Sequence, residues 1–238
     1  MRILITAGPT LSPLDAVRHI ANRSSGTLAT TLAQLAHDAG HHVLLLRSVL
    51  CTCPPPQGID LLPFDTHRSL LQTLQDCATQ ERIHALWHAA AVGDFIVEKI
   101  TTTENQPSPP QSHDLKPPTT APARPSDTDN ATAAAPLPGK LDSRSGPLHI
   151  TLALAPKILP LLPDLFPAAT IVGWKYEVDG SRHDVIQKGL RQLRQCRTAA
   201  CVLNGPAWGE GWALLRPDAR YQSAKTYQEL FNLLTQLN

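Results

Sequence analysis

Residues 2–10, Arg-Ile-Leu-Ile-Thr-Ala-Gly-Pro-Thr, decide the fold that we expect for this chain. The run from Arg2 to Thr6 predicts a short buried strand, because it is continuously apolar after one charge. Gly8-Pro9-Thr10 then ends the strand with residues that are typical of turns. A buried strand that stops in a small loop fits the start of a parallel sheet that is covered on both faces.

The rest of the chain repeats this alternation of strand and helix. Apolar residues from Leu28 to Ala36 recur at helical spacing, and Gly40 ends that run. We expect further strands at residues 43–46, 83–88, 148–154, 170–173 and 199–203, helices around 70–74, 158–165, 181–196 and 224–237, and a hairpin at 212–221. This order predicts one α/β domain over residues 1–238, a Rossmann-like three-layer sandwich with a mainly parallel central sheet and a hairpin subregion.

Residues 101–138 interrupt the pattern. They hold nine prolines, many Ser, Thr and Ala residues, and only Leu115 and Leu137 as large apolar side chains. Such a segment cannot bury enough surface to offset its ordering entropy. We therefore expect a flexible insertion in a lid loop, of which residues 101–136 are dispensable.

Composition limits the classes of partner. The formal net charge of the 238 residues is +1, which predicts no global attraction to nucleic acid or to an acidic membrane. No apolar run reaches the length of a membrane span, and the N-terminus lacks the apolar centre of a secretory signal. The cysteine count of five is odd, and Cys51 and Cys53 lack a second Cys/His pair. We expect a cytoplasmic protein without a metal site of its own.

Four polar clusters fall at the carboxyl ends of predicted strands, where open α/β sheets bind their ligands. They are residues 6–10, 89–95, 173–177 and 204–206. We expect these loops to meet in one crevice. His41, His42 and His88 lack carboxylate or cysteine companions at ligand spacing, so we expect surface or core histidines there.

The first loop continues through Asn22-Arg23-Ser24-Ser25-Gly26 into the first helix. Ser24 or Ser25 can cap this helix, and the free amides of a helix start can bind an anion. An ordinary capped helix after a tight turn accounts for the same residues. The pattern is neither the dinucleotide GxGxxG sequence nor the P-loop GxxxxGK[ST] sequence.

Several motifs resemble those of the phosphopantothenate–cysteine ligases, and the chain is similar to a divergent member of that family. Ile-Thr-Ala-Gly-Pro-Thr followed by Asn22–Gly26 resembles the opening of that family, and Ala89–Phe95 resembles its second signature. Lys140-Leu141, Gly146–Leu152, Ala155–Leu159 and Trp174–Glu177 are similar to later segments, with the third motif closer to the eukaryotic branch. The resemblance runs through nearly the whole chain except 101–138.

The resemblance implies an ATP- or CTP-dependent ligation of cysteine to 4′-phosphopantothenate through an acyl-nucleotide, in coenzyme A biosynthesis. The nucleotide acts with Mg²⁺, and pyrophosphate leaves. Both steps need oriented donors for developing negative charge, which the amide of Asn22 and nearby backbone amides can supply. The family further implies a homodimer, small-molecule substrates only, and neither a nucleic acid nor a membrane partner.

Residue by residue, the resemblance implies catalytic roles for Asn22 and for Lys140, which matches the family's lid lysine; Lys99 is its competitor. Arg18, Asn22 and Ala91 would bind the acid substrate. The nucleotide would contact Gly8, Thr10, Ser24, Ser25, Gly26, Ala90, Asp94, Trp174 and Lys188. A turn or cap also accounts for Asp94, and a solvated helix face also accounts for Lys188.

Two departures leave a second function open. Thr27 stands where the family usually has Lys or Arg, and Gly205 follows Asn204 where bacterial members have aspartate. A catalytically degenerate nucleotide-binding paralogue, acting as a binding module, would tolerate both changes. A nicotinamide or flavin oxidoreductase on a similar sheet is disfavoured by the absent dinucleotide glycine pattern.

Overall fold

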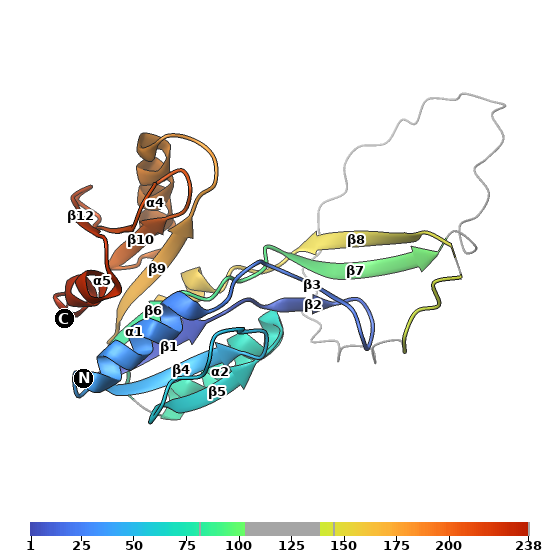
Figure 1. Ribbon diagram of the computed structural model, residues 1–238, viewed down its shortest axis with the longest axis horizontal. Helices are drawn as coiled ribbons and strands as arrows, with labels where there is room; N and C mark the ends of the chain where they lie inside the picture. The colour runs from blue at the N-terminus through green and yellow to red at the C-terminus, as the bar shows by residue number, and fades with distance from the viewer. Residues whose placement is uncertain (81, 103–138, 145, 238) are drawn as a thin grey trace.

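The computed structural model describes residues 1–80, 82–102, 139–144 and 146–237. Its centre is an eight-stranded sheet in the order β12-β11-β10-β9-β6-β1-β4-β5 (Figure 1). The strands of this sheet are β1 (Arg2–Ala7), β4 (His42–Ser48), β5 (Asp60–Phe64), β6 (Ala85–His88), β9 (Thr170–Tyr176), β10 (Ala200–Asn204), β11 (Trp212–Leu215) and β12 (Tyr221–Ala224). The six strands from β10 to β5 run parallel, and β11 and β12 pair antiparallel at one edge. The predicted α/β fold with a mainly parallel sheet is confirmed.

Helices cover both faces, because the buried strands are apolar on both sides. In β1, Ile3 and Ile5 pack with α1 (Thr27–Asp38) and α5 (Tyr227–Thr235). Leu4, which points the other way, packs with α2 (His67–Gln80) and α3 (Leu162–Leu165), and α4 (Arg182–Cys196) covers the neighbouring strands on that face. A 3₁₀ turn at Leu159–Leu161 precedes α3. The result is the predicted three-layer sandwich.

A long arm projects from this body (Figure 1). It consists of the antiparallel pair β2 (Leu11–Pro13) and β3 (His19–Ala21) and the hairpin of β7 (Phe95–Thr102) and β8 (Leu148–Leu154). The backbone amide of Val97 donates to Ser12 Oγ at 2.8 Å and so ties one pair to the other. The four-stranded arm therefore brings together segments that lie far apart in the sequence.

The structure corrects several expectations about elements. Strands β2, β3, β5 and β7 were not predicted, and Thr101 and Thr102 belong to β7 instead of the expected insertion. A deletion meant to remove only the insertion must spare those two residues. The predicted flexibility and dispensability of the remaining insertion, 103–138, fall outside the described residues. Within the part of the chain that is described, no helix combines the length and apolarity that crossing a bilayer requires.

Candidate functional site

The chain reverses direction across the sheet between β1 and β6. From β1 it proceeds to β4 and β5 on one side, and it then returns to β6 and β9 on the other. Ligands of open α/β sheets bind outside the carboxyl ends of the strands at such a switch point. An open pocket of about 1180 Å³ lies at these strand ends. Its lining comprises residues 22–29, 88–94, 156–160 and 174–177 with Lys188, Arg191, Gln192, Gln195, Cys196 and Asn204.

Three of the four predicted clusters therefore line one pocket, and the fourth lies beneath it. Gly8 and Thr10 are buried and do not belong to the lining. Gly8 accepts from the amide of Ala91 at 2.9 Å, and Thr10 Oγ1 accepts from the amide of Gly93 at 2.8 Å. Their contacts hold the loop of residues 89–94 in place, so any effect that they have on a nucleotide passes through that loop.

Helix α1 begins at the pocket without the predicted serine cap. Its N-cap is Gly26, which has a φ of 78° and makes no side-chain cap hydrogen bond. The Ser25 hydroxyl instead accepts from the amide of Thr27 at 3.3 Å. Residues 27–29 line the pocket, and the amides of Leu28 and Ala29, in the first turn of this 12-residue helix, are available to an anion.

Glycine is required at position 26 because of its left-handed φ and because a side chain there would clash with a neighbour. A Cβ at Gly26 would overlap Cys51 Sγ, and a Cβ at Gly8 would overlap the same sulfur. The Cys51 thiol thus sits between the two glycines, and burial raises its pKa. This arrangement allows the loop before α1 to approach the end of β1 closely.

Asn22 connects the loop before α1 to the loop after β6. Its Nδ2 atom donates to Ala91 O at 3.3 Å and to Val92 O at 3.2 Å. The side chain is exposed on the pocket wall, next to Ser24 and Ser25, which also line the pocket. The predicted neighbourhood of Asn22, Ala91 and the serines is therefore present.

Asp94 and Lys157 form an ion pair at the pocket rim. Both side chains are about two-thirds exposed, so the pair contributes little to the stability of the fold. Ala155, two residues before Lys157, donates its amide to Asp94 O at 2.9 Å. This contact fixes the two segments beside each other.

Glu177 lies in the opposite wall between two lysines. It pairs with Lys188 and, at 3.1 Å, with Lys175. Burial raises the pKa of Glu177, but the hydrogen bonds from Lys188 and Lys175 together outweigh burial and leave that pKa lowered. One carboxylate therefore faces two ammonium groups, and Arg191 adds a further cation to the lining.

The wall beside Glu177 also holds two unpaired polar atoms. Trp174 Nε1 and Asn204 Oδ1 are buried, and neither has a hydrogen-bond partner within the described part of the chain. Both residues line the pocket. The next residue, Gly205, has a φ of 107°, and a Cβ there would lie 2.8 Å from Glu177 N. The aspartate that bacterial members place at this position would not fit this backbone.

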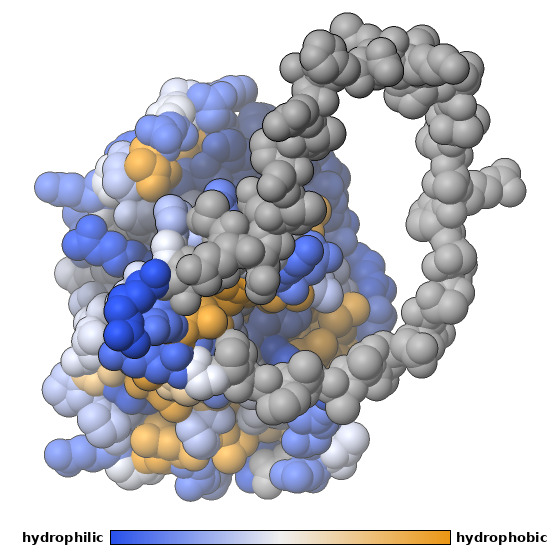
Figure 2. Space-filling model, turned by 90° about the vertical axis from the view of Figure 1, so that its right-hand side faces the viewer, coloured by the Kyte–Doolittle hydropathy of each residue, from blue (hydrophilic) through white to orange (hydrophobic). Residues whose placement is uncertain are grey.

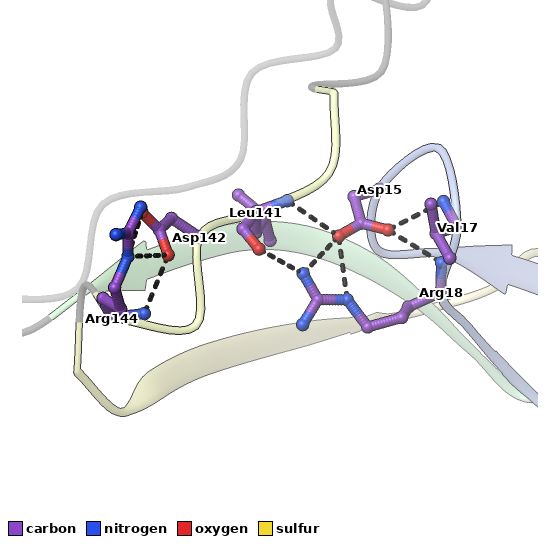
Figure 3. Close-up of polar contacts among 6 residues, drawn as sticks. All are labelled: Asp15, Val17, Arg18, Leu141, Asp142 and Arg144. Atoms are coloured by element: carbon purple, nitrogen blue, oxygen red, sulfur yellow. Dashed lines mark hydrogen bonds and ion pairs between the residues drawn. The ribbon is translucent and has the colours of Figure 1, made fainter.

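The structure does not bring Arg18 and Lys140 to the pocket lining. Arg18 lies at the end of the arm, where its guanidinium binds Asp15 through Nε at 2.9 Å and Nη2 at 2.5 Å (Figure 3). Arg18 Nη2 also donates to Leu141 O at 2.8 Å, and Leu141 N donates to Asp15 at 3.1 Å. Lys140 precedes this clamp and is exposed, and Lys99 lies on β7, also outside the lining.

Several pocket residues were not singled out from the sequence. Lys157, Lys175 and Glu177 received no role, although they belong to motifs 155–159 and 174–177. Arg191 carried a usable signal, because it follows Lys188 by three residues and so shares its helix face. Among the described residues, no group of three or more His, Cys, Asp or Glu side chains could hold a metal ion.

Comparison with known proteins places the chain among relatives. The family described as DNA/pantothenate metabolism flavoprotein C-terminal domain matches residues 1–112. The human phosphopantothenate–cysteine ligase is 31% identical over 198 residues, which cover 74% of this chain and 64% of that protein. The coenzyme A biosynthesis bifunctional protein CoaBC of Thermococcus kodakarensis is 24% identical, over 85% of this chain and 41% of that protein. The chain thus spans less than two-thirds of the length of these relatives.

Solved structures agree on the fold. A DNA/pantothenate metabolism flavoprotein from Streptococcus pneumoniae superposes with a TM-score of 0.77 at 20% identity, over 99% of this chain and 97% of that one. A Cab2 mutant in complex with phosphopantothenate-cysteine superposes with a TM-score of 0.69 at 18% identity, over 99% of this chain and 84% of that one. The chain belongs to the family of the phosphopantothenate–cysteine ligases and the C-terminal domains of CoaBC proteins.

Proposed function

We propose that the protein ligates cysteine to 4′-phosphopantothenate with ATP or CTP, through an acyl-nucleotide. The observation that carries the proposal is the joint position of Asn22, the start of α1 and the lysines around Glu177 in one pocket. The human relative, a phosphopantothenate–cysteine ligase, supports this choice of substrates, as does the similar structure in complex with phosphopantothenate-cysteine.

The cations of the pocket suit the nucleotide. Lys157, Lys175, Lys188 and Arg191 line it, against the carboxylates of Asp94 and Glu177. A triphosphate would draw Lys175 and Lys188 from Glu177 by offering more negative charge. A Mg²⁺ ion bound to the phosphates would neutralise further charge, and the exposed carboxylate of Asp94 offers it an oxygen ligand.

In the first step, a carboxylate oxygen of the acid attacks the α-phosphorus, and the bond to pyrophosphate breaks. In the second, the amine of cysteine attacks the carbonyl carbon, and the nucleoside monophosphate leaves with the electron pair as the amide forms. The amides at the start of α1 can stabilise negative charge on the phosphate, and Asn22 can orient the amine. Ser24, Ser25 and Gly26 would then contact the nucleotide.

Arg18 and Lys140 can act in this pocket only if the arm moves or if a second copy presents its arm. A homodimer is supported by the apolar side chains that the arm exposes. All five cysteines are free, which supports a reducing compartment such as the cytoplasm.

Pyrophosphate release tests the proposal directly. The purified protein is incubated with ATP or CTP, with and without phosphopantothenate and cysteine, and the amide product is measured by mass spectrometry. We expect pyrophosphate only in the presence of the acid and product only when cysteine is added. Lys188→Ala removes a pocket cation that would contact the nucleotide, so we expect it to lower pyrophosphate release. Arg194→Ala serves as the matched control, since it removes an exposed cation of the same helix outside the pocket lining.

Thr27 favours a second candidate, a paralogue that binds the nucleotide without catalysis. It leaves the start of α1 without the cation that the family usually has there. Nucleotide binding by titration without pyrophosphate release would support this second function and contradict the first.

A further inference from the structure

His88 occupies the switch point of the sheet. It ends β6, beside Thr6 of β1 on one side and Gly173 of β9 on the other. Its exposed fraction is only 6%, yet it lines the pocket. The proposed mechanism gives this side chain no role.

The hydrogen bonds around Thr6 determine which ring nitrogen carries the proton. Thr6 is completely buried, and its Oγ1 accepts from the amide of Ala90 at 3.1 Å. The hydroxyl proton of Thr6 then needs an acceptor, and His88 Nδ1 lies 3.0 Å away. Nδ1 therefore accepts, and the neutral ring carries its proton on Nε2.

The Nε2–H group has no hydrogen-bond partner among the described residues. Among the described residues, the polar contact of the His88 ring is made by Nδ1 with Thr6. Nε2 is unpaired but is not fully buried, and His88 lines the pocket, so this nitrogen retains contact with the pocket space. A buried ring with one satisfied and one unsatisfied nitrogen is costly unless a ligand or water completes it.

The ring stays neutral at physiological pH. Burial lowers the pKa of His88 to about 4, and no charged group adds to this effect. Its strand neighbours Thr6 and Gly173 do not titrate. The charged side chains of the pocket are Arg23, Asp94, Lys157, Lys175, Glu177, Lys188 and Arg191, and cations outnumber carboxylates.

We propose that His88 contacts the ligand directly, with its Nε2–H donating a hydrogen bond to an anionic oxygen of the bound molecule. That oxygen belongs either to a phosphate of the nucleotide or to the carboxylate of the acid. A neutral donor at the switch point fixes the position of such an oxygen without taking up a proton. This inference rests on the proposed function, because it assumes that the pocket binds these anions.

Nitrogen-15 NMR of the wild-type protein, with its histidine rings labelled, tests the tautomer and the contact without any substitution. We expect His88 to show the Nε2–H tautomer from pH 5.5 to 8. Saturation with ligand should shift the Nε2 resonance and leave Nδ1 nearly unchanged. A proton on Nδ1, or an Nε2 resonance that ignores every ligand, would overturn the inference.

Binding titrations with ATP, CTP, pyrophosphate and phosphopantothenate, each added alone, identify the oxygen. His88→Leu should lower the affinity for whichever probe carries that oxygen by about ten- to a hundred-fold, the scale of a hydrogen bond to a charged group. His88→Gln, which keeps an amide donor, should recover part of that loss. Thr6→Val keeps the ring but removes the hydrogen bonds to His88 Nδ1 and from the Ala90 amide, so it should weaken binding by less than His88→Leu.

The outcomes separate the two proposals. If wild type binds and His88→Leu binds equally well, only the role of His88 fails. If His88→Gln, which keeps a donor, binds as weakly as His88→Leu, the histidine acts through packing and the contact is refuted. If wild type binds none of the four probes, the proposed function fails together with this inference.

Discussion

The side chain of Asn22 links two loops of the pocket, and this fixes which of its atoms is free. Both hydrogens of its amide group are used by Ala91 O and Val92 O. The Oδ1 atom is therefore the one that can accept from an incoming amine. A role in the cysteine-dependent step, expected from the family motif, agrees with an acceptor at this position.

Asn22→Asp should slow the cysteine-dependent step by about a hundred-fold, the scale of one lost oriented contact at a reacting centre. The carboxylate cannot donate to the two carbonyl oxygens and would repel them. Nucleotide activation should be affected less, so the acyl-nucleotide should accumulate in rapid-quench experiments. Asn22→Ala, which loses the same hydrogen bonds without adding charge, is the control. Equal slowing of both half-reactions would contradict a specific role in the second.

Asp94→Ala should change the nucleotide affinity in opposite directions for two possible roles of that carboxylate. If Asp94 binds ribose hydroxyls or a nucleotide-bound metal, we expect nucleotide affinity to fall by about ten-fold, within the range for one hydrogen bond to a charged group. If Asp94 only neutralises Lys157, its removal frees a cation and affinity should rise. We predict the fall, with an unchanged Tm, because the ion pair is exposed. Calorimetric titration with Lys157→Ala alongside decides the sign.

At the scale of elements, the start of α1 depends on a close approach of three segments. Gly26 has a left-handed φ, and its missing Cβ leaves room for Cys51, which also contacts Gly8. The N-terminal amides of α1 reach the pocket because of this approach. The sequence did not show that Cys51 packs against the two glycines.

Gly26→Ala should therefore destabilise the protein by more than about 1–2 kcal/mol, the cost of a left-handed φ for a residue with a Cβ. The overlap with Cys51 Sγ adds to that cost. In a Cys51→Ala background, Gly26→Ala should cost less stability, because the overlap with the sulfur is relieved. The cost of the left-handed φ should remain. Urea unfolding of the four proteins measures both parts. A Gly26→Ala variant as stable as wild type would contradict the geometry at the start of α1.

The clamp at the end of the arm predicts a pH dependence. The hydrogen bonds from Arg18 hold the pKa of Asp15 well below its usual range, against the effect of burial. A carboxyl group with a lowered pKa stabilises the fold above its unfolded pKa of about 4, and this stability is lost as the pH falls further. Asp15→Asn should lower the Tm at pH 7, and the difference should shrink below pH 4. Thermal unfolding at pH 7, 4 and 2.5 checks this; a constant difference would rule it out.

The sequence predicted the elements whose pattern is local and missed those that depend on distant partners. Helix α4 was predicted from residues 181–196, and Ser181 and Asp184 indeed form its capping box. Strand β7 has β8 as its partner, which begins 46 residues after Thr102, and β5 carries Pro63 at the sheet edge. Asp15 binds Leu141, 126 residues away. Lys140 was chosen by its spacing to a motif, and spacing does not reveal that its segment lies on the arm.

At the scale of the whole molecule, the arm exposes apolar side chains on one face of its hairpin. Ile150, Leu152 and Leu154 alternate along β8, and Phe95 lies opposite Leu154. All four are exposed, Leu154 to 76%. Figure 2 views the molecule from the side of the arm and shows hydrophobic surface among hydrophilic surface. Such an apolar face is typical of a contact with another chain, and we propose that a second copy covers it.

Leu152→Glu combined with Leu154→Glu should convert a dimer into monomers, because two charges would be buried in the contact. Sedimentation equilibrium measures the change, and Thr151→Glu on the other face of β8 is the matched control. Mixing Asn22→Asp with Lys140→Ala then tests whether the arm acts in the partner's pocket. Activity regained on mixing would support that arrangement. A wild-type protein that sediments as a monomer would contradict the dimer.

The hairpin of the arm also offers a place to attach a second folded protein. The described residues stop at Thr102, the last residue of β7, and resume at Gly139, ahead of β8. Thr102 pairs with Leu148, so the two strands hold the attachment region together. A fluorescent domain inserted there would share no core residue with the eight-stranded sheet, and long insertions at such sites cost little in closure entropy. If two copies associate through their arms, energy transfer between their inserted domains would report that association in real time, so the protein would become an optical sensor of its own assembly.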